Sequence, residues 1–395
     1  MIIGLNLCGK LKHLVRNKFY FMKTFLFVAN RGFALTSSRL GIFKSLKRSG
    51  HNVVVCVGLD AHVEKLQELG ITVEEISVDR GGLSALRDVH LFIRLAKLYR
   101  KWKPAVIHNF HAKPIVFGAL ASLVVPRAKV VNNFEGLGFP FVSKGVMYRL
   151  SLIAFKIALY RSSQNVFLNY DDLDLFLSKG IVSSSKATLV FSPGVDVEKF
   201  RPSKEKELAS INVVMAGRLL WSKGIKEFCF AAKEIKKDHP EVRFLIAGEW
   251  DLHHSDSIDK KSLQSLVDKC GVEFLGYVND MPALLNETYC FVLPTKYREG
   301  VPRVVLEAQS SGVPVITTNV PGCRHAVIDG QTGYIVEPGD HKSLSQSIDR
   351  LIISRELRKE FSENAIARAT SQFDTKIVTE KQLDVYRELG FSIIS

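Results

Sequence analysis

Short runs of β-branched and aromatic residues alternate with helix-like stretches along this chain, and the alternation starts again after residue 200. In the first part, strand-like runs lie at 25–28, 53–57, 105–107 and 129–131. Helix-like stretches at 40–49 and 61–69 separate the early runs, and a glycine follows each of them. Strands of this kind, separated by helices, are typical of a parallel sheet with helices on both faces.

The second part of the chain repeats the pattern. Strand-like runs lie at 211–215, 242–247, 272–275, 290–294 and 313–317. A chain of 395 residues is long enough for two domains of roughly 150–200 residues each. We therefore expect an α/β protein with two doubly wound modules, joined near residues 191–202, and a last helix at about 375–389. Ligands bind beyond the carboxyl ends of the strands in such sheets, so the cleft between the modules is the expected site.

The positive charge of the chain is concentrated in its first half. The formal net charge is +14, with +15 on residues 1–200 and −1 on residues 201–395. A basic module joined to a neutral one predicts an anionic partner for the basic module: a membrane surface, a nucleic acid or a phosphorylated substrate. Composition alone is also consistent with an ordinary solvated surface.

The cysteines and the apolar runs indicate a reducing compartment and no spanning helix. Six scattered cysteines form no Cys-x-x-Cys pair and no metal-ligand spacing with histidine, which predicts buried, reduced thiols. No apolar run reaches the roughly 18–20 residues of a spanning helix, and basic residues follow the apolar start instead of preceding it, unlike a signal peptide. We expect a cytoplasmic protein, at most peripheral to a membrane, with residues 1–21 as a basic N-terminal extension.

One loop carries two acids at the start of a predicted helix. In the segment 299–307, Glu299 ends the loop, Gly300 and Val301 open the helix, and Glu307 lies about two turns further on. Backbone N–H groups at a helix start favour an anion, as does the helix dipole. Alone, the segment is also consistent with an ordinary helix that has acids near its N-terminus.

A second loop, 216–224, carries two cations between a strand and a helix. Gly217 and Gly224 permit tight turns and close backbone approach. Arg218 and Lys223 lie at the carboxyl edge of the predicted sheet, where a guanidinium fork and an ammonium group can bind a diphosphate. Alone, they are equally consistent with two surface cations.

Together with further motifs in the same order, these loops resemble the retaining glycosyltransferases of family 4, which have the GT-B fold. The further motifs are Pro193-Gly194-Val195-Asp196, Leu275-Gly276-Tyr277-Val278, residues 291–295, residues 312–316 and Gly330-Gln331-Thr332-Gly333-Tyr334. The resemblance covers nearly the whole chain from Met22 onward. It implies an N-terminal acceptor-side domain at 22–195, a C-terminal nucleotide-sugar-binding domain at 196–372, and a C-terminal helix at 373–395 that returns to the first domain.

The resemblance implies that the second domain binds the donor. Arg218 and Lys223, beside Gly217, correspond to the pair that holds the donor diphosphate. The turn with Tyr277 and Val278 corresponds to the one that binds the base. Fixed cations stabilise the charge of a nucleoside diphosphate leaving group, so this arrangement implies no metal and no cofactor.

The acids of the segment 299–307 also match the family. Glu299 corresponds to the acid that contacts the donor sugar, and the N–H groups near Gly300 and Val301 correspond to contacts with sugar or phosphate. Glu307 corresponds to the acid that accepts the ribose hydroxyls. The implied catalytic set is Glu299, Arg218 and Lys223 with one histidine of the first domain.

The first domain contributes that histidine and the acceptor side. His111 follows a strand and resembles the family's histidine that contacts the donor sugar, with His108 as the alternative. Arg39, Lys113 and Glu135 are the candidate acceptor-side residues. The loop 30–34 departs from the family pattern, because it has one glycine where relatives often have two adjacent glycines near the donor phosphate.

A subset that extends lipid-linked oligosaccharides resembles this chain at 220–224, 135–138 and 321–324. The resemblance implies transfer of a hexose or N-acetylhexosamine from a UDP-sugar to an undecaprenyl-diphosphate-linked glycan, in bacterial O-antigen or capsule synthesis. The apolar, basic stretch 142–161 is either an interfacial helix on an anionic membrane or a domain-packing helix. A GT-B sugar-nucleotide epimerase and a basic nucleic-acid-binding protein are the alternative functions; we expect no nucleic-acid partner.

Overall fold

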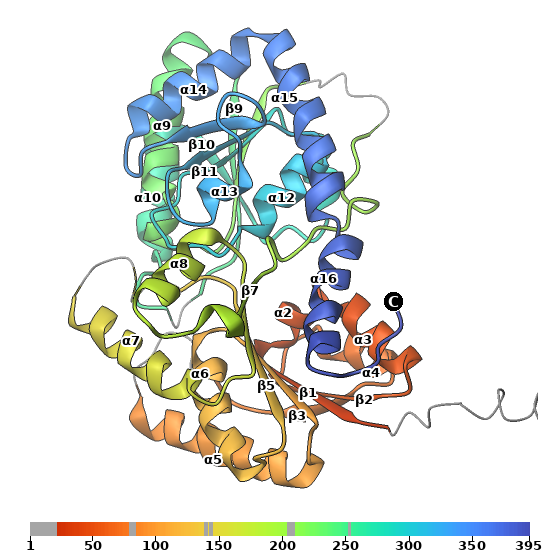
Figure 1. Cartoon of the computed structure of the whole chain (residues 1–395). Coiled ribbons are helices and arrows are strands. Elements are labelled where there is room, and N and C mark those ends of the chain that lie inside the picture. The colour runs from red at the N-terminus through yellow and green to blue at the C-terminus, as the bar shows by residue number, and fades with distance from the viewer. Residues whose placement is uncertain (1–21, 79–83, 138–140, 142–144, 204–209, 252–253) are drawn as a thin grey trace, which may run out of the picture.

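The computed structural model describes residues 22–78, 84–137, 141, 145–203, 210–251 and 254–395. The predicted extension at 1–21 therefore lies outside the described residues. Within them, the chain forms two parallel sheets with helices packed around each, one above the other in Figure 1. The expected pair of doubly wound α/β modules is confirmed.

The first sheet has the strand order β3-β2-β1-β4-β5-β6-β7, and its described pairings are parallel. Its strands are β1 (Thr24–Arg31), β2 (Asn52–Gly58), β3 (Thr72–Glu75), β4 (Val106–Phe110), β5 (Lys129–Phe134), β6 (Gln164–Phe167) and β7 (Ala187–Leu189). The helices of this module are α2 (Gly32–Thr36), α3 (Leu40–Arg48), α4 (Val63–Glu68), α5 (Ala85–Trp102), α6 (Ala112–Ala121), α7 (Val146–Leu159) and α8 (Tyr170–Ser178), with 3-10 turns at Ser122–Val124 and Ser184–Lys186.

The second sheet has the order β10-β9-β8-β11-β12-β13, again with parallel pairings. Its strands are β8 (Asn212–Ala216), β9 (Arg243–Ala247), β10 (Val272–Gly276), β11 (Cys290–Leu293), β12 (Val315–Thr318) and β13 (Gly333–Val336). The helices are α9 (Ile225–Asp238), α10 (Lys260–Cys270), α11 (Met281–Asn286), α12 (Arg303–Ser310), α13 (Cys323–Ala326), α14 (His341–Ile353) and α15 (Arg355–Arg368). A 3-10 turn lies at Trp221–Lys223.

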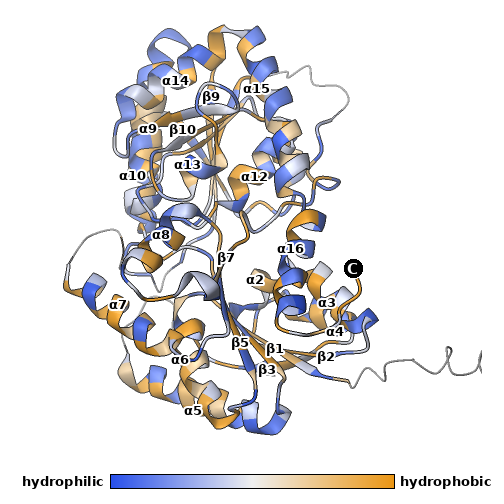
Figure 2. Ribbon diagram, viewed as in Figure 1, coloured by the Kyte–Doolittle hydropathy of each residue, from blue (hydrophilic) through white to orange (hydrophobic). Residues whose placement is uncertain are grey.

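Side chains of the central strand β1 are buried on both faces of the first sheet. Phe25 and Phe27 belong to a cluster with α3, whereas Leu26 and Val28 belong to a cluster with α5. The alternation follows from the two-residue period of a strand, and burial on both faces explains the continuous apolar run in the sequence. Figure 2 shows the same apolar strands inside each module.

The last helix belongs by its contacts to the first module. After α15 the chain passes through a π-helical segment, Ala369–Phe373, into α16 (Thr375–Glu388). This helix packs on α3, and Tyr386 is fully buried in the same cluster as Phe25. The chain therefore crosses between the two sheets twice, once before β8 and once before α16.

The structure also bears on two expectations from the sequence, the reduced cysteines and the absence of a spanning helix. The cysteines at 56, 229, 270, 290 and 323 are buried and unpaired, as expected, while Cys8 lies outside the described residues. In the part of the chain that the structure describes, no helix is long and apolar enough to cross a membrane.

Candidate active site

The strand order places one switch point in each sheet, where neighbouring strands lead to opposite sides. These points lie between β1 and β4 in the first sheet and between β8 and β11 in the second. Ligands of doubly wound sheets bind at the carboxyl ends of these strands. The residues that follow β4 begin with His111, and those that follow β8 begin with Gly217, so the predicted residues flank the two switch points.

Lys223 and Glu299 meet at the switch point of the second sheet. The Lys223 ammonium contacts Glu299 Oε1, and Thr295 Oγ1 lies 3.4 Å from the same oxygen. Gly224 allows this meeting, because it has a φ of 85° and a Cβ atom there would lie 2.0 Å from the Pro294 carbonyl oxygen. Both charged side chains are largely buried, so their pairing is little screened by solvent.

Arg218 lies in the same loop with a partner of its own. Its Nη1 lies 3.2 Å from Asp251 Oδ2, and its guanidinium carbon lies 5.8 Å from the centre of the Tyr297 ring. The Lys223 ammonium lies 5.4 Å from the same ring centre. Burial alone would lower the pKa of Arg218, but Tyr297, followed by Glu299 and Asp251, raises it overall. Two cations thus lie near the Tyr297 ring, each paired with a carboxylate.

The loop that carries Glu299 corrects one detail of the sequence analysis. Helix α12 begins at Arg303 with Pro302 as its N-cap residue, so Gly300 and Val301 lie in the loop before the helix. Glu307 is one turn into α12, not two. Its carboxylate pairs with Arg303 at 2.9 Å across one helical turn.

Glu307 and Arg303 line a cleft between the two modules. The cleft has a volume of about 910 Å³ and is also lined by residues of α2, α3 and α16. The Arg303 guanidinium lies 5.1 Å from the Phe33 ring centre, so the two modules are in contact at this edge of the cleft. The turn after β10 presents Tyr277, which is exposed, whereas Val278 packs against the core of the second module.

His111 has a strained backbone at the start of α6. Its φ of 68° and ψ of 161° lie in a region that is populated almost entirely by glycine. Its Nε2 lies 3.3 Å from Glu135 Oε2, and its side chain is partly exposed. The alternative, His108, is fully buried and bonds the Tyr386 hydroxyl at 2.5 Å through Nδ1. The structure therefore favours His111, whose side chain is partly exposed, over the buried His108 as the histidine that can contact a ligand.

Arg39 does not face an acceptor as the sequence analysis expected. Its side chain has no exposed surface, and its Nη2 lies 2.6 Å from Glu135 Oε1. Burial alone would raise the pKa of the Glu135 carboxyl, but the hydrogen bond with His111 and the charge of Arg39 lower it to about 2. Arg39 is thus a buried counter-ion that holds Glu135 ionised beside His111.

Lys113 has an acidic partner that the sequence did not predict, and its acceptor-side role stays a prediction. Its ammonium lies 2.6 Å from Asp88 Oδ1, so the side chain links the start of α6 to the start of α5. Of the three candidate acceptor-side residues, Glu135 is the one that pairs with His111.

Three glycines allow close backbone contacts at the junction of the two modules: Gly136 and Gly300 touch across it, and Gly322 touches Gly300 within the second module. A Cβ atom on Gly136 would lie 2.5 Å from the Gly300 nitrogen, and one on Gly300 would lie 2.6 Å from the Glu135 carbonyl carbon. A Cβ atom on Gly322 would lie 2.0 Å from the Gly300 oxygen. Because only glycine permits this approach, the loops that follow β5, β11 and β12 meet directly, and Glu135 and Glu299 lie on neighbouring segments.

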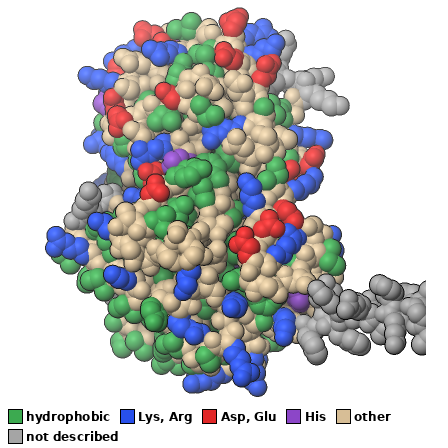
Figure 3. Space-filling model, in the orientation of Figure 1, with side chains coloured by type: hydrophobic (Ala, Val, Ile, Leu, Met, Phe, Trp, Pro, Cys, Tyr) green, Lys and Arg blue, Asp and Glu red, His purple; other side chains and the backbone are tan. Residues whose placement is uncertain are grey.

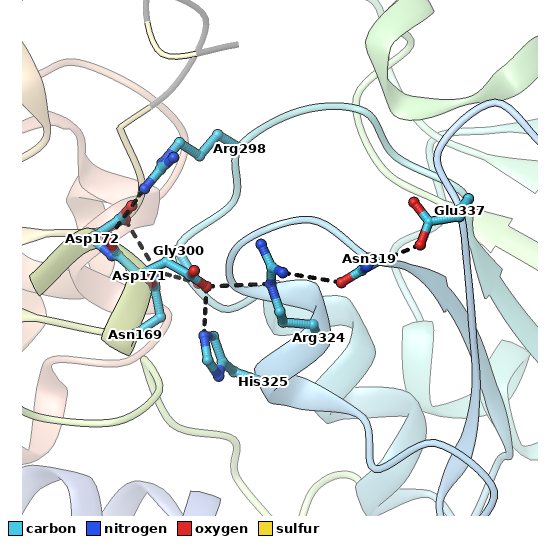
Figure 4. A network of polar contacts seen from close by, with 9 residues as sticks. All are labelled: Asn169, Asp171, Asp172, Arg298, Gly300, Asn319, Arg324, His325 and Glu337. Atoms are coloured by element: carbon cyan, nitrogen blue, oxygen red, sulfur yellow. Dashed lines mark hydrogen bonds and ion pairs between the residues drawn. The ribbon is translucent and has the colours of Figure 1, made fainter. Parts of the chain in front are cut away.

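A polar network that sequence reasoning missed fixes the loop of Glu299 to the first module (Figure 4). Asn169, the N-cap residue of α8, donates to the Gly300 oxygen at 2.9 Å. Arg298 Nε lies 2.8 Å from the buried Asp172 Oδ1. The spacing of Asn169 and Asp172 is a helix N-cap signal in the sequence, but nothing in the sequence indicates that this cap also contacts the second module.

The same network continues to α13. Asp171 Oδ2 lies 2.7 Å from His325 Nε2 and 3.3 Å from Arg324 Nε (Figure 4). The hydrogen bond with His325 is the main cause that lowers the pKa of Asp171 below its ordinary value.

Family models match both modules of the chain. A model of the glycosyl transferases group 1 matches residues 196–368, and a glycosyl transferase 4-like model matches residues 25–169. Over 381 residues the chain is 30% identical to the N,N'-diacetylbacillosaminyl-diphospho-undecaprenol alpha-1,3-N-acetylgalactosaminyltransferase of Campylobacter jejuni, which covers 91% of this chain and 97% of that protein. The chain belongs to the group 1 glycosyltransferases.

Further relatives are bacterial glycosyltransferases. The UDP-Gal:alpha-D-GlcNAc-diphosphoundecaprenol alpha-1,3-galactosyltransferase of Escherichia coli is 28% identical over 323 residues, 78% of this chain and 81% of that protein. A solved structure of Anabaena HepE with UDP-glucose has a TM-score of 0.75 at 20% identity, covering 93% of this chain and all of that one. This likeness confirms the GT-B fold.

Proposed function

We propose that this protein is a retaining glycosyltransferase that transfers a hexose or N-acetylhexosamine from a UDP-sugar to a glycan on undecaprenyl diphosphate, in the synthesis of bacterial surface polysaccharide. The observation that carries this proposal is the Lys223–Glu299 pair, with Arg218 beside it, at the switch point of the second sheet. The names of the Campylobacter and Escherichia relatives support the acceptor, since both act on diphosphoundecaprenol-linked sugars.

In this proposal, Arg218 and Lys223 hold the donor diphosphate and stabilise the charge that develops on it as the sugar leaves. Lys223 then lies between a phosphate and Glu299, which keeps the ammonium in place. The proposal gives a metal no role, because the two fixed cations supply the neutralising charge. In the same proposal, Tyr277 contacts the base and Glu307 contacts the ribose.

Glu299 and His111 act at the sugar. Their loops are brought together by the contact between Glu135–Gly136 and Glu299–Gly300, and Glu135 orients His111 through its Nε2 atom. We assign retention to attack on the donor's front face, where the leaving phosphate accepts the acceptor's proton.

The acceptor side is proposed to contact an anionic membrane through α7. Val146, Leu150, Ile153 and Ile157 form an exposed apolar stripe along this helix, and Arg149 and Lys156 lie beside the stripe. Helix α5 adds exposed apolar residues near its N-terminus, and α6 packs between the two helices. Figure 3 shows mainly basic side chains at the lower end of this module, which complements an anionic surface.

The proposal is tested by mass spectrometry of products from a panel of UDP-sugars with undecaprenyl-diphosphate-linked sugar acceptors. We expect one UDP-sugar to add a single residue to the acceptor, with unchanged turnover in EDTA. An isomerised UDP-sugar without transfer would indicate the epimerase instead, and no product from any donor would contradict the proposal.

A further inference from the structure

A second cavity lies apart from the candidate donor site, at the junction of the two modules. It has a volume of about 570 Å³, within the usual range for small-molecule sites. Its walls come from both modules: Tyr170 begins α8, Phe191 lies in the linking segment, and Arg324 lies on α13. None of the residues assigned to the donor site lines it. Hydrophobic side chains gather where the modules meet on this face (Figure 3).

The charge of the cavity is positive. Arg324, Arg368 and Lys381 line it, against the single carboxylate of Asp329. Arg324 forms an ion pair with Asp171 (Figure 4). Within the described residues, however, neither Arg368 nor Lys381 forms an ion pair with an acid. Arg368 donates to the carbonyl oxygens of residues 325 and 326 at 2.6 and 3.0 Å, so its position is fixed while its charge is not neutralised.

Arg368 is partly buried, and burial makes its charged form less favourable. Burial alone lowers the pKa of its guanidinium to about 10. An anion in the cavity would compensate for the lost solvation, because a charge-assisted contact replaces the missing counter-ion.

One wall of the cavity is aromatic. The Tyr170 ring lies 6.0 Å from Phe191 and 5.8 Å from His325, measured between ring centres, and Tyr170 is half exposed. Aromatic faces pack against the C–H groups of a sugar ring, while Asp329 and Gln372 supply acceptors for its hydroxyl groups. Cations and aromatic rings in the lining of one cavity therefore match a ligand with a ring and a phosphate.

We infer that this cavity binds a small phosphorylated sugar, at a site distinct from the donor site. The phosphate contacts Arg368 and Lys381, and the ring lies against Tyr170 and Phe191. Since residues of both modules line the cavity, the ligand bridges them. This inference does not depend on the transfer reaction proposed above.

Isothermal titration calorimetry of the full chain with glucose 1-phosphate tests the inference, with glucose and inorganic phosphate as comparisons. We expect glucose 1-phosphate to bind at least tenfold more tightly than either, and equally well when saturating UDP is present. Lys381→Glu and Tyr170→Ala, both at exposed side chains, are expected to weaken binding at least tenfold. The matched control is Lys261→Glu, a charge reversal on the exposed surface of α10, which is expected to bind like the wild type.

Four outcomes overturn the inference. The first is that glucose 1-phosphate does not bind at millimolar concentration, and the second is that inorganic phosphate binds as tightly as glucose 1-phosphate. The third is that UDP displaces glucose 1-phosphate. The fourth is that the Lys381→Glu and Tyr170→Ala variants bind glucose 1-phosphate with the affinity of the wild type. Because the assay measures binding without transfer, a failed transfer reaction leaves its result unaffected.

Discussion

Glu135 is a residue of the candidate site whose pKa is strongly shifted by its surroundings. It lies between a fully buried Arg39 and His111, and its pKa is lowered to about 2. A carboxylate with a lowered pKa stabilises the fold above the ordinary pKa of about 4.5, and the contribution is lost as the pH falls towards 2.

Glu135→Gln is therefore expected to lower the free energy of unfolding by about 3 kcal/mol at pH 7, because it leaves Arg39 buried without a counter-ion. Urea unfolding from pH 7 to pH 3 measures the difference from the wild type. It should stay constant above about pH 5 and decrease below it. The control Glu68→Gln, at an exposed position of α4, should follow the wild type, and a pH-independent difference for Glu135→Gln would refute the assigned charge.

Single residues show where sequence reasoning succeeds. Lys223 and Glu299 are predicted from loops that follow strands, because strand ends of a parallel sheet converge at one edge. The pairings of Arg39 with Glu135 and of Asp251 with Arg218 are not predicted, because they depend on side-chain directions that packing decides. The donor-site roles of these residues stay predictions.

At the level of elements, α7 combines an apolar stripe with basic residues. From its sequence, it is either an interfacial helix on an anionic membrane or a domain-packing helix. The stripe of Val146, Leu150, Ile153 and Ile157 is exposed in the structure, so α7 does not bury it against any element that the structure describes. The start of α12 shows the opposite case. Sequence reasoning began this helix at Gly300, three residues before Arg303, where it begins in the structure. The residues between the strand and Pro302 do not indicate how long the loop is.

Replacement of two stripe residues tests the membrane contact. Ile153→Asp with Ile157→Asp is expected to reduce co-sedimentation with anionic vesicles at low salt at least tenfold, because it removes apolar burial and adds repulsion. The control Ile353→Asp changes an equally exposed isoleucine of α14, on the other module. Unchanged co-sedimentation of the double variant, or strong binding to neutral vesicles, would argue against an anionic membrane as the partner.

At the scale of the whole molecule, the alternation of strands and helices predicts both sheets, because continuous apolar strands separated by helices are typical of a parallel sheet covered on both faces. The way in which the two modules meet could not be predicted. It depends on glycines that lie more than 150 residues apart and on the capping residue Asn169. The domain limits at 195 and 372 stay predictions.

Gly136→Ala tests the contact between the modules. The residue has a φ of 101°, and its Cβ would overlap the Gly300 nitrogen. We expect turnover to fall at least tenfold, because the loops of Glu135 and Glu299 must separate. Gly390→Ala is the matched control, with a φ of 92° and open space around the Cβ position, so both variants share a left-handed cost of about 1–2 kcal/mol. Equal turnover in the two variants would contradict this role of the contact.

The measurement that tests the account most directly is the turnover of Glu299→Ala with the UDP-sugar and lipid acceptor that the wild type uses. Removing a group that acts at the reacting sugar is expected to lower kcat by about 10²–10³-fold, with an unchanged circular dichroism spectrum. Glu241→Ala, at an exposed carboxylate, should keep wild-type turnover. Near-normal turnover of Glu299→Ala would contradict the account, because the Lys223–Glu299 pair would then not be the centre of the reaction.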